Sequence, residues 1–160
     1  MNNGEFVDNF EIKLLNGLTF DLYNSLKRGP VVINFIMGTW CPFCTNHLKK
    51  IRTWQETINR NVTMLIISSE PPENLRHWLN KNPMTYLFAS DENAEIINSF
   101  GVKHLLIDIA SPATFLIDVD TQIKMAFKGI RTRKTRAQML ETICTTADCG
   151  DTEVTLERIL

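Results

Sequence analysis

The sequence predicts a single α/β domain built on a mixed β-sheet, and three observations support that prediction. Two apolar runs, residues 31–36 and 62–68, flank a helical pattern, which is typical of a right-handed βαβ unit with parallel strands. Two later runs, residues 113–118 and 123–128, flank a tight turn and predict an antiparallel hairpin. With 160 residues, 44% of them hydrophobic, the chain (1–160) is long enough for one well-packed domain and short for two.

A small entry unit precedes the sheet. Apolar and polar residues alternate over residues 9–22 around Asn16-Gly17, which is the strongest short hairpin signal. A turn of helix is expected at residues 23–27. The continuous β-branched and aromatic run 31–36 then has the character of a central strand that is buried on both faces. We therefore expect an N-terminal β-hairpin extension in front of the central strand.

The remaining elements continue the alternation of strands and helices. Apolar residues recur at helical spacing after the cysteines, so a helix is expected through about Arg60. Further elements are a short helix around residues 75–79, a strand at 84–89, a helix at 94–100 with Ser90 as N-cap candidate, and a last helix from about Lys134 with Ala137, Leu140 and Cys144 on its inner face. Residues 102–110 fit an extended segment and a short helix equally. Residues 147–160 are expected to be a loosely held C-terminal tail.

The chemistry is expected at Trp40-Cys41-Pro42-Phe43-Cys44, where the central strand gives way to a helix. Two thiols three residues apart at a helix start lie one turn from each other and can close a disulfide. Unpaired N–H groups and the helix dipole stabilise a thiolate at the first position, so we predict Cys41 as an exposed nucleophile. Cys44 lies a turn further in, where apolar surroundings raise the pKa, and is expected to be the resolving thiol.

Other uses of the cysteines are weaker. A structural zinc site needs four N/S ligands, and Cys144 and Cys149 lie about a hundred residues away without a second Cys-x-x-Cys, so no metal is predicted. A disulfide across two residues closes too small a loop to stabilise the fold much. Cys144 falls on an apolar helical face and is expected to pack there as a free thiol. Cys149 could pair with it or serve as an extra resolving thiol.

The charge balance excludes some classes of partner. A net charge of −1 and a pI near 6.3 give no electrostatic case for nucleic acid or an anionic membrane. No run approaches the ~20 apolar residues that span a bilayer, and no secretory signal is evident, so a cytoplasmic location is expected, or an exported one if a signal has been removed. Residues 124–136 hold six basic residues and no acidic one. This stretch is expected to be a solvated face, with a docking patch for an acidic partner as the alternative.

Taken together, these motifs resemble the thioredoxin fold, in the redoxin branch that joins AhpC/TSA-type peroxiredoxins with TlpA/ResA-like thiol-disulfide oxidoreductases. The resemblance covers about residues 6–146 and includes Ser111-Pro112 before the hairpin. It implies a three-layer α/β/α fold, a redox-active cysteine pair, no cofactor, and a partner protein that reduces or oxidises the pair. It also implies a cis peptide before Pro112 and backbone N–H and C=O groups of Ser111 offered to the substrate, with Trp40 and Pro42 beside them.

The spacing around the cysteines departs from the oxidoreductase pattern. One additional residue stands between Asn34 and Cys41, which is similar to the peroxiredoxin-like group. In that alignment Cys44 falls at the peroxidatic position, while Cys41 and Met37 replace the threonine and proline of the peroxidase motif. The spacing therefore favours peroxide, and the residue types favour disulfide exchange.

Two histidines are further candidates. His47 stands where the TlpA-like branch often has a glutamate, and it could relay a proton during exchange. Its polar neighbours favour the alternative of an exposed helix residue. The segment 101–112 is longer than the family's usual link, and His104 on it could approach the thiols or be merely solvated.

Three hypotheses for function follow. The first is a thiol-disulfide oxidoreductase that acts on a disulfide-containing protein or a small thiol substrate through Cys41 and Cys44. The second is a thiol peroxidase in which one of these cysteines is oxidised to a sulfenic acid and resolved by the other. The third is a redox-inactive binding domain that uses the surface around Trp40 and Pro112 for a protein partner.

Overall fold

The structure is a computed structural model and describes residues 1–58 and 61–149. Its centre is a five-stranded sheet in the order β5-β4-β3-β6-β7. The strands are β1 (Glu11–Lys13), β2 (Thr19–Asp21), β3 (Val31–Phe35), β4 (Thr63–Ser68), β5 (Leu87–Ser90), β6 (Ala113–Ile117) and β7 (Ile123–Lys128). The helices are α1 (Leu22–Leu26), α2 (Pro42–Ile51), the 3-10 helix η1 (Arg52–Glu56), α3 (Pro72–Lys81), α4 (Glu95–Ser99) and α5 (Arg133–Ala147).

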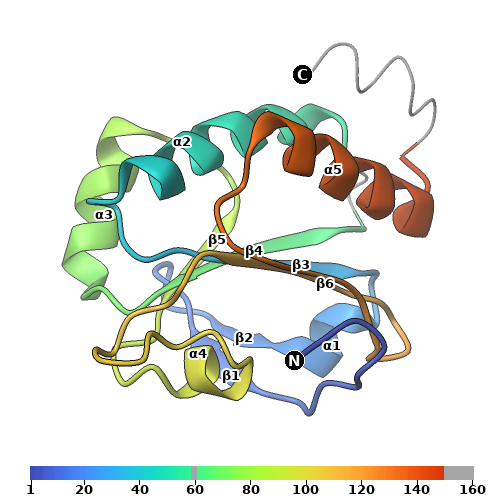
Figure 1. The fold of residues 1–160 in the computed structure, drawn as a ribbon, viewed down its shortest axis with the longest axis horizontal. Helices are drawn as coiled ribbons and strands as arrows, with labels where there is room; N and C mark the ends of the chain where they lie inside the picture. Colours follow the sequence, from blue (N-terminus) through green and yellow to red (C-terminus); the bar gives the residue numbers. More distant parts are fainter. Residues whose placement is uncertain (59–60, 150–160) are drawn as a thin grey trace.

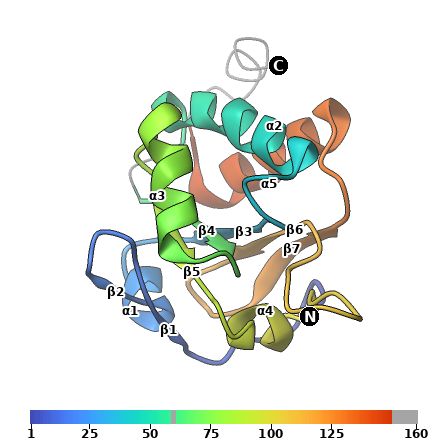
Figure 2. The same cartoon turned by 90° about the vertical axis from the view of Figure 1, so that its left-hand side faces the viewer.

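Three layers stack in the structure, as the resemblance to the thioredoxin fold implies. Helices α2 and α5 cover one face of the sheet, and α1, α4 and the β1–β2 hairpin cover the other (Figure 1 and Figure 2). Strand β3 pairs in parallel with β4 and antiparallel with β6, so the sheet is mixed. The separate hairpin β1–β2 confirms the expected N-terminal extension, and a bridge from Leu14 to Ala89 attaches it to the edge strand β5.

Strand β3 divides the core between the two faces of the sheet, because successive side chains point in opposite directions. Val31, Ile33 and Phe35 enter the layer shared with the hairpin, α1 and α4. There the ring of Phe35 lies 5.2 Å from that of Phe100 and 5.8 Å from that of Phe115. Asn34 points to the other face, toward α2, and is a buried polar residue in an otherwise apolar strand.

Some predicted boundaries are wrong. The helix after the cysteines does not continue regularly, because α2 changes to the 3-10 helix η1 after Ile51, and residues 59–60 of the expected range lie outside the described residues. Ser90 is the last residue of β5 and does not cap the next helix. The carboxylate of Asp91 accepts the N–H groups of Glu95 and Ile97 instead, at 3.1 and 2.8 Å.

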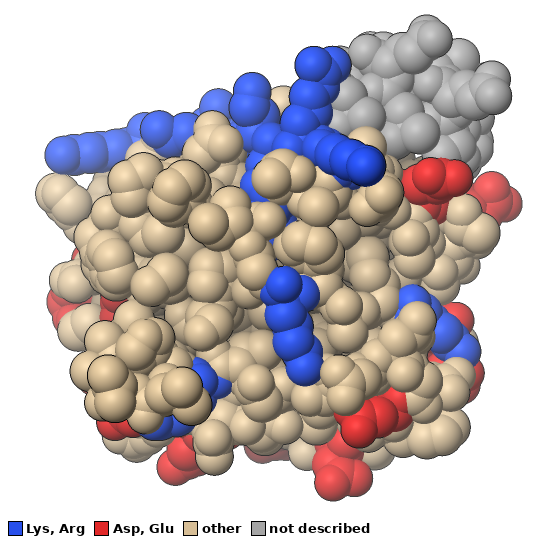
Figure 3. Space-filling view, in the orientation of Figure 1, with Lys and Arg blue, Asp and Glu red and all other residues tan. Residues whose placement is uncertain are grey.

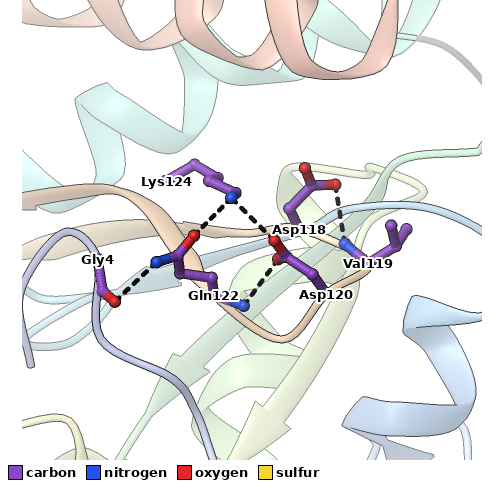
Figure 4. Close-up of polar contacts among 6 residues, drawn as sticks. All are labelled: Gly4, Asp118, Val119, Asp120, Gln122 and Lys124. Atoms are coloured by element: carbon purple, nitrogen blue, oxygen red, sulfur yellow. Dashed lines mark hydrogen bonds and ion pairs between the residues drawn. The ribbon is translucent and has the colours of Figure 1, made fainter.

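The N-terminal residues lie along the turn between β6 and β7 (Figure 4). Gln122 donates from Nε2 to the carbonyl of Gly4 at 2.9 Å, which ties the start of the chain to this turn. Lys124 binds the carboxylate of Asp120 at 2.9 Å and the Gln122 side chain at 2.6 Å. Exposed side-chain hydrogen bonds therefore close this turn and attach the N-terminal residues to it.

At the other end of the chain, α5 continues to Ala147, so the predicted tail begins no earlier than residue 148. Residues 150–160, which make up most of that predicted tail, lie outside the described residues. In the part of the chain that the structure describes, no helix is both long and apolar enough to span a bilayer.

Candidate functional site

The two cysteines of the motif lie at the start of α2. Cys41 is the N-cap residue and Pro42 occupies the first turn, where its missing N–H leaves no hydrogen bond unmade. Both thiols are free, but Cys41 is only 3% exposed and Cys44 is fully buried. The prediction of an exposed Cys41 is therefore wrong, because both side chains pack into the apolar layer between the sheet and helices α2 and α5.

The environment of Cys44 strongly favours the protonated thiol. Burial raises its pKa to about 11, and the adjacent Cys41 thiol acts in the same direction. The backbone N–H of Met37, 3.4 Å from the Cys44 Sγ, and the charge of Arg131 act against this rise. Cys44 is thus a protonated thiol at neutral pH, which agrees with the raised pKa expected for the second cysteine.

A buried polar network lies beside the thiols on the same face of the sheet. The side-chain oxygen of Asn34 accepts a hydrogen bond from His47 Nε2 at 2.9 Å and another from the Thr114 hydroxyl at 2.8 Å. Asn34 and Thr114 face each other across β3 and β6, and the Asn34 amide nitrogen lies 3.0 Å from the Met64 sulfur. The network therefore links the two central strands to helix α2.

His47 is completely buried, so the prediction of an exposed helix residue is wrong. It lies three residues after Cys44 and four before Ile51, and this spacing puts all three on the inner face of α2. Because the amide oxygen of Asn34 can only accept, Nε2 must carry the proton, and Nδ1 is a buried lone pair without a hydrogen-bond partner. Burial, and then the nearby charges of Arg131 and Arg136, hold the pKa of His47 well below its ordinary value. His47 is therefore a neutral base at neutral pH.

Arg131 brings a positive charge to the site, and it is only 4% exposed. Its Nη1 donates to the carbonyls of Phe35 and Ala113 at 3.2 and 2.8 Å and to the Thr114 hydroxyl at 3.2 Å. Its Nη2 is buried with no hydrogen-bond partner. One edge of the guanidinium thus joins the polar network, and the other is unpaired.

Within residues 1–58 and 61–149, Arg131 forms no ion pair with a carboxylate. Burial lowers its pKa to about 10, and the groups that raise it are Cys44 and Cys41. The cation is therefore placed to stabilise negative charge on these sulfurs. Arg131 and Arg136 are both buried, so the predicted solvated face over 124–136 is wrong at these two positions.

The loop that leads into the motif is attached to the end of β4. The carboxylate of Glu70, which is 8% exposed, accepts the backbone N–H and the hydroxyl of Thr39, both at 2.7 Å. Ser68 donates to the same carboxylate at 3.0 Å. Just before Thr39, a Cβ on Gly38 would lie 2.2 Å from the indole nitrogen of Trp40. The absence of a side chain at Gly38 therefore lets the indole lie against the loop.

The predicted substrate platform at Ser111 and Pro112 differs from expectation. No cis peptide occurs in the described ranges, so the predicted cis bond before Pro112 is wrong; a trans bond is the ordinary preference of X–Pro. The Ser111 N–H donates to the carbonyl of Val102 at 2.7 Å and is not open to a substrate. The Pro112 carbonyl accepts the N–H of Gly129 at 2.8 Å. Trp40, in contrast, is 61% exposed, and Pro42 is also exposed.

The other two cysteines form a disulfide. Cys144 at the end of α5 is bonded to Cys149, which is five residues further on, so the expectation of a free packing thiol is wrong and that of pairing is correct. No group of three or more His, Cys, Asp and Glu side chains within the described ranges could hold a metal ion.

Lys and Arg side chains gather along the α2 and α5 edge of the molecule, and most Asp and Glu side chains lie elsewhere (Figure 3). Lys49, Lys50 and Lys134 are exposed.

Sequence reasoning missed several residues of this site. A single asparagine inside the apolar run of β3 was the available signal for the network around Asn34. Thr114 lies in a run of residues that predicts a buried, apolar strand. Glu70 belongs to the turn that is predicted to end the preceding strand. Arg131 is one of six basic residues in its stretch, and nothing local distinguishes it from its exposed neighbours.

Comparisons with known proteins agree with this architecture. Thiol-disulfide oxidoreductase ResA of Geobacillus kaustophilus is 25% identical over 142 residues, which cover 88% of this chain and 77% of that protein. Peroxidoxin BcpB from Mycobacterium tuberculosis superposes with a TM-score of 0.80 at 23% identity, over 91% of this chain and 96% of that one. Enterococcus faecalis AhpC superposes with a TM-score of 0.79 at 17% identity, over 94% and 98% of the two chains. These structures establish the thioredoxin-like fold. Residues 4–126 match the AhpC/TSA family pattern, so this chain belongs to the AhpC/TSA family, within the redoxin superfamily of thiol-dependent oxidoreductases.

Proposed function

We propose that the protein is a thiol-disulfide oxidoreductase in which Cys41 is the nucleophile and Cys44 the resolving thiol. The observation that supports this assignment is the difference in environment between the two cysteines. Cys44 is fully buried with a pKa raised to about 11. Cys41 stands ahead of it at the N-cap of α2, next to the exposed side chain of Trp40. The first sulfur to meet a substrate is therefore that of Cys41.

The reaction transfers two electrons from the protein to the substrate. The Cys41 thiolate attacks one sulfur of the substrate disulfide, a mixed disulfide forms, and the other substrate sulfur leaves as a thiolate that takes up a proton. Cys44 loses its proton and attacks the Cys41 sulfur, which releases the second substrate thiol. The protein is left with a Cys41–Cys44 disulfide, and a partner dithiol protein returns it to the reduced state.

The resolving step requires a thiolate at Cys44, and two buried residues assist it in this proposal. Arg131 lowers the pKa of Cys44 through its charge, against the larger effect of burial. His47 has an unpartnered Nδ1 lone pair on the same face of α2 and relays the proton from the thiol. Because the pKa of His47 is low, it does not retain the proton, which ends on the substrate thiolate that leaves the Cys41 sulfur.

Single cysteine variants test the order of attack. In Cys44→Ser, a substrate disulfide should trap a stable mixed disulfide at Cys41, which intact-mass measurement detects. Cys41→Ser should give no adduct under the same conditions. An adduct at Cys44 only, in Cys41→Ser, would reverse the assignment of the two roles.

A thiol peroxidase is the second candidate. The family match over residues 4–126 and the likeness to the peroxidoxin BcpB favour it. In that reaction a thiolate attacks the peroxide O–O bond and becomes a sulfenic acid, and the other cysteine condenses with it to release water. Rates of the reduced protein with hydrogen peroxide and with a protein disulfide, measured side by side, distinguish the two. Fast peroxide consumption with slow exchange would refute our first choice, and failure of both would leave a redox-inactive binding domain.

A further inference from the structure

Residues 103–110, called here the finger, form an ordered projection between α4 and β6. Lys103 and Ala110 form an antiparallel bridge at its base. Further out, the His104 N–H donates to the carbonyl of Ile109 at 2.8 Å, and Lys103 pairs with Asp108 at 3.2 Å. The sequence favours neither an extended segment nor a helix over residues 102–110, and the stretch 101–112 that contains them is longer than the corresponding link in the family. The structure shows that it is held by its own hydrogen bonds.

The tip of the finger is apolar and open to solvent. Leu105 is 95% exposed, Leu106 86% and Ile107 53%. The N–H of Leu106 donates to Nδ1 of His104 at 3.1 Å, so this histidine orders the tip. Three consecutive apolar residues held out in water are unfavourable in a free protein and are typical of a binding surface.

The finger lies on the same side of the molecule as the start of α2. Figure 1 shows the start of α2 and the finger at the same left-hand edge, and Figure 2 shows both facing the viewer. The base of the finger is fastened to the segment before β6 through the hydrogen bond from Ser111 to Val102. Trp40 and Phe43, each 61% exposed, add apolar surface next to Cys41. Apolar side chains of the finger tip and of the redox motif are thus exposed on the same side of the protein.

We infer that the finger binds an apolar segment of the polypeptide that carries the substrate disulfide. This inference rests on the proposed exchange at Cys41 and names its substrate class: protein disulfides flanked by apolar residues. A peroxide or oxidised glutathione offers no apolar side chain for the finger tip to bind, whereas a polypeptide segment can. A second copy of this chain is the other possible occupant, but a tip of three residues offers less than the roughly 800 Å² per partner that stable interfaces bury. Transient redox encounters use smaller surfaces, because the partner must leave after each turnover.

The test compares three disulfides in single turnovers with the reduced protein. Two are synthetic peptides with one cysteine in a mixed disulfide with glutathione, flanked by Leu and Phe in one and by Ser and Thr in the other. The third is oxidised glutathione. The finger variant carries Leu105→Ser, Leu106→Ser and Ile107→Ser. The control carries Leu18→Ser and Val119→Ser, which remove exposed apolar side chains from the hairpin and from the β6–β7 turn.

The rate constant for the apolar peptide should fall roughly tenfold in the finger variant, since three apolar contacts are lost. The rates with the polar peptide and with oxidised glutathione, and all rates of the control, should stay within about twofold of those of the unaltered protein. An unchanged rate with the apolar peptide overturns the inference and leaves the exchange reaction intact. No reaction of the unaltered protein with any of the three disulfides refutes the proposed function itself. A dimer that the finger variant abolishes, seen by sedimentation, would assign the finger to a second copy and also overturn the inference.

Discussion

Lowering the pH should destabilise this protein through His47. Its pKa lies well below the ordinary value of 6.5 because the ring is buried and faces the charges of Arg131 and Arg136. Between the two pKa values, the unfolded chain binds a proton at this histidine and the folded protein does not. The free energy of unfolding therefore rises with pH in this window and falls as the solution is acidified below pH 6.5.

The size of the effect follows from the depth of burial. His47 is 0% exposed and its Nδ1 has no hydrogen-bond partner, so the folded state has no group ready to stabilise a proton there. A group protonated only in the unfolded state contributes a slope of at most about 1.4 kcal/mol per pH unit. Summed from pH 7 to pH 5, the loss of stability from this one residue approaches about 2 kcal/mol.

Urea unfolding at several pH values measures this contribution. On acidification from pH 7 to pH 5, the unaltered protein should lose more stability than His47→Gln. The difference between the two losses should approach about 2 kcal/mol. His77→Gln, at an exposed position of α3, is the matched control and should keep the full pH dependence. Equal pH dependence in the unaltered protein and His47→Gln would show that His47 is protonated in the folded state and would refute the reasoning.

Three other substitutions test features of the described site. Glu70→Ala leaves the N–H and hydroxyl of Thr39 without their acceptor, and we expect a loss of about 2 kcal/mol in the free energy of unfolding by urea titration. Gly38→Ala should displace the indole of Trp40 and raise its quenching by acrylamide, because the new Cβ would lie 2.2 Å from the ring nitrogen. Cys149→Ser opens a disulfide of sequence separation 5 and should lower stability by about 2 kcal/mol, a loss that reductant should reproduce only in the unaltered protein.

The regular elements could be predicted because their signals are local. Strand β3, helix α2 and strand β4 follow from apolar runs and helical spacing, and the antiparallel pairing of β6 with β7 follows from the tight turn between them. The cysteine pair was equally visible, since two thiols three residues apart at a helix start have few other uses. These features depend on neighbours in the chain, which the sequence displays directly.

The polar part of the site could not be predicted in the same way. His47 lies at the helical spacing that marks the inner face of α2, and its polar neighbours outweighed that spacing. Arg131 is 87 residues from Cys44 in the sequence, and only the path of the chain after β7 brings its charge near that sulfur. The apolar residues of the finger show neither the two-residue periodicity of a strand nor the 3.6-residue periodicity of a helix. Long-range placement of single polar residues is set by the folded chain, and no local pattern encodes it.

The sheet also separates two kinds of interior, and this affects how the protein tolerates change. The layer below β3 holds the aromatic cluster around Phe35, Phe100 and Phe115, while the cysteine pair and its polar network lie above. Volume-conserving substitutions among the aromatic and aliphatic residues below should alter the melting temperature and leave the thiol chemistry in place. In related sequences, substitutions in the lower layer can therefore change stability without changing the reactivity of the thiols. A thermostable version for engineering is best sought in the lower layer.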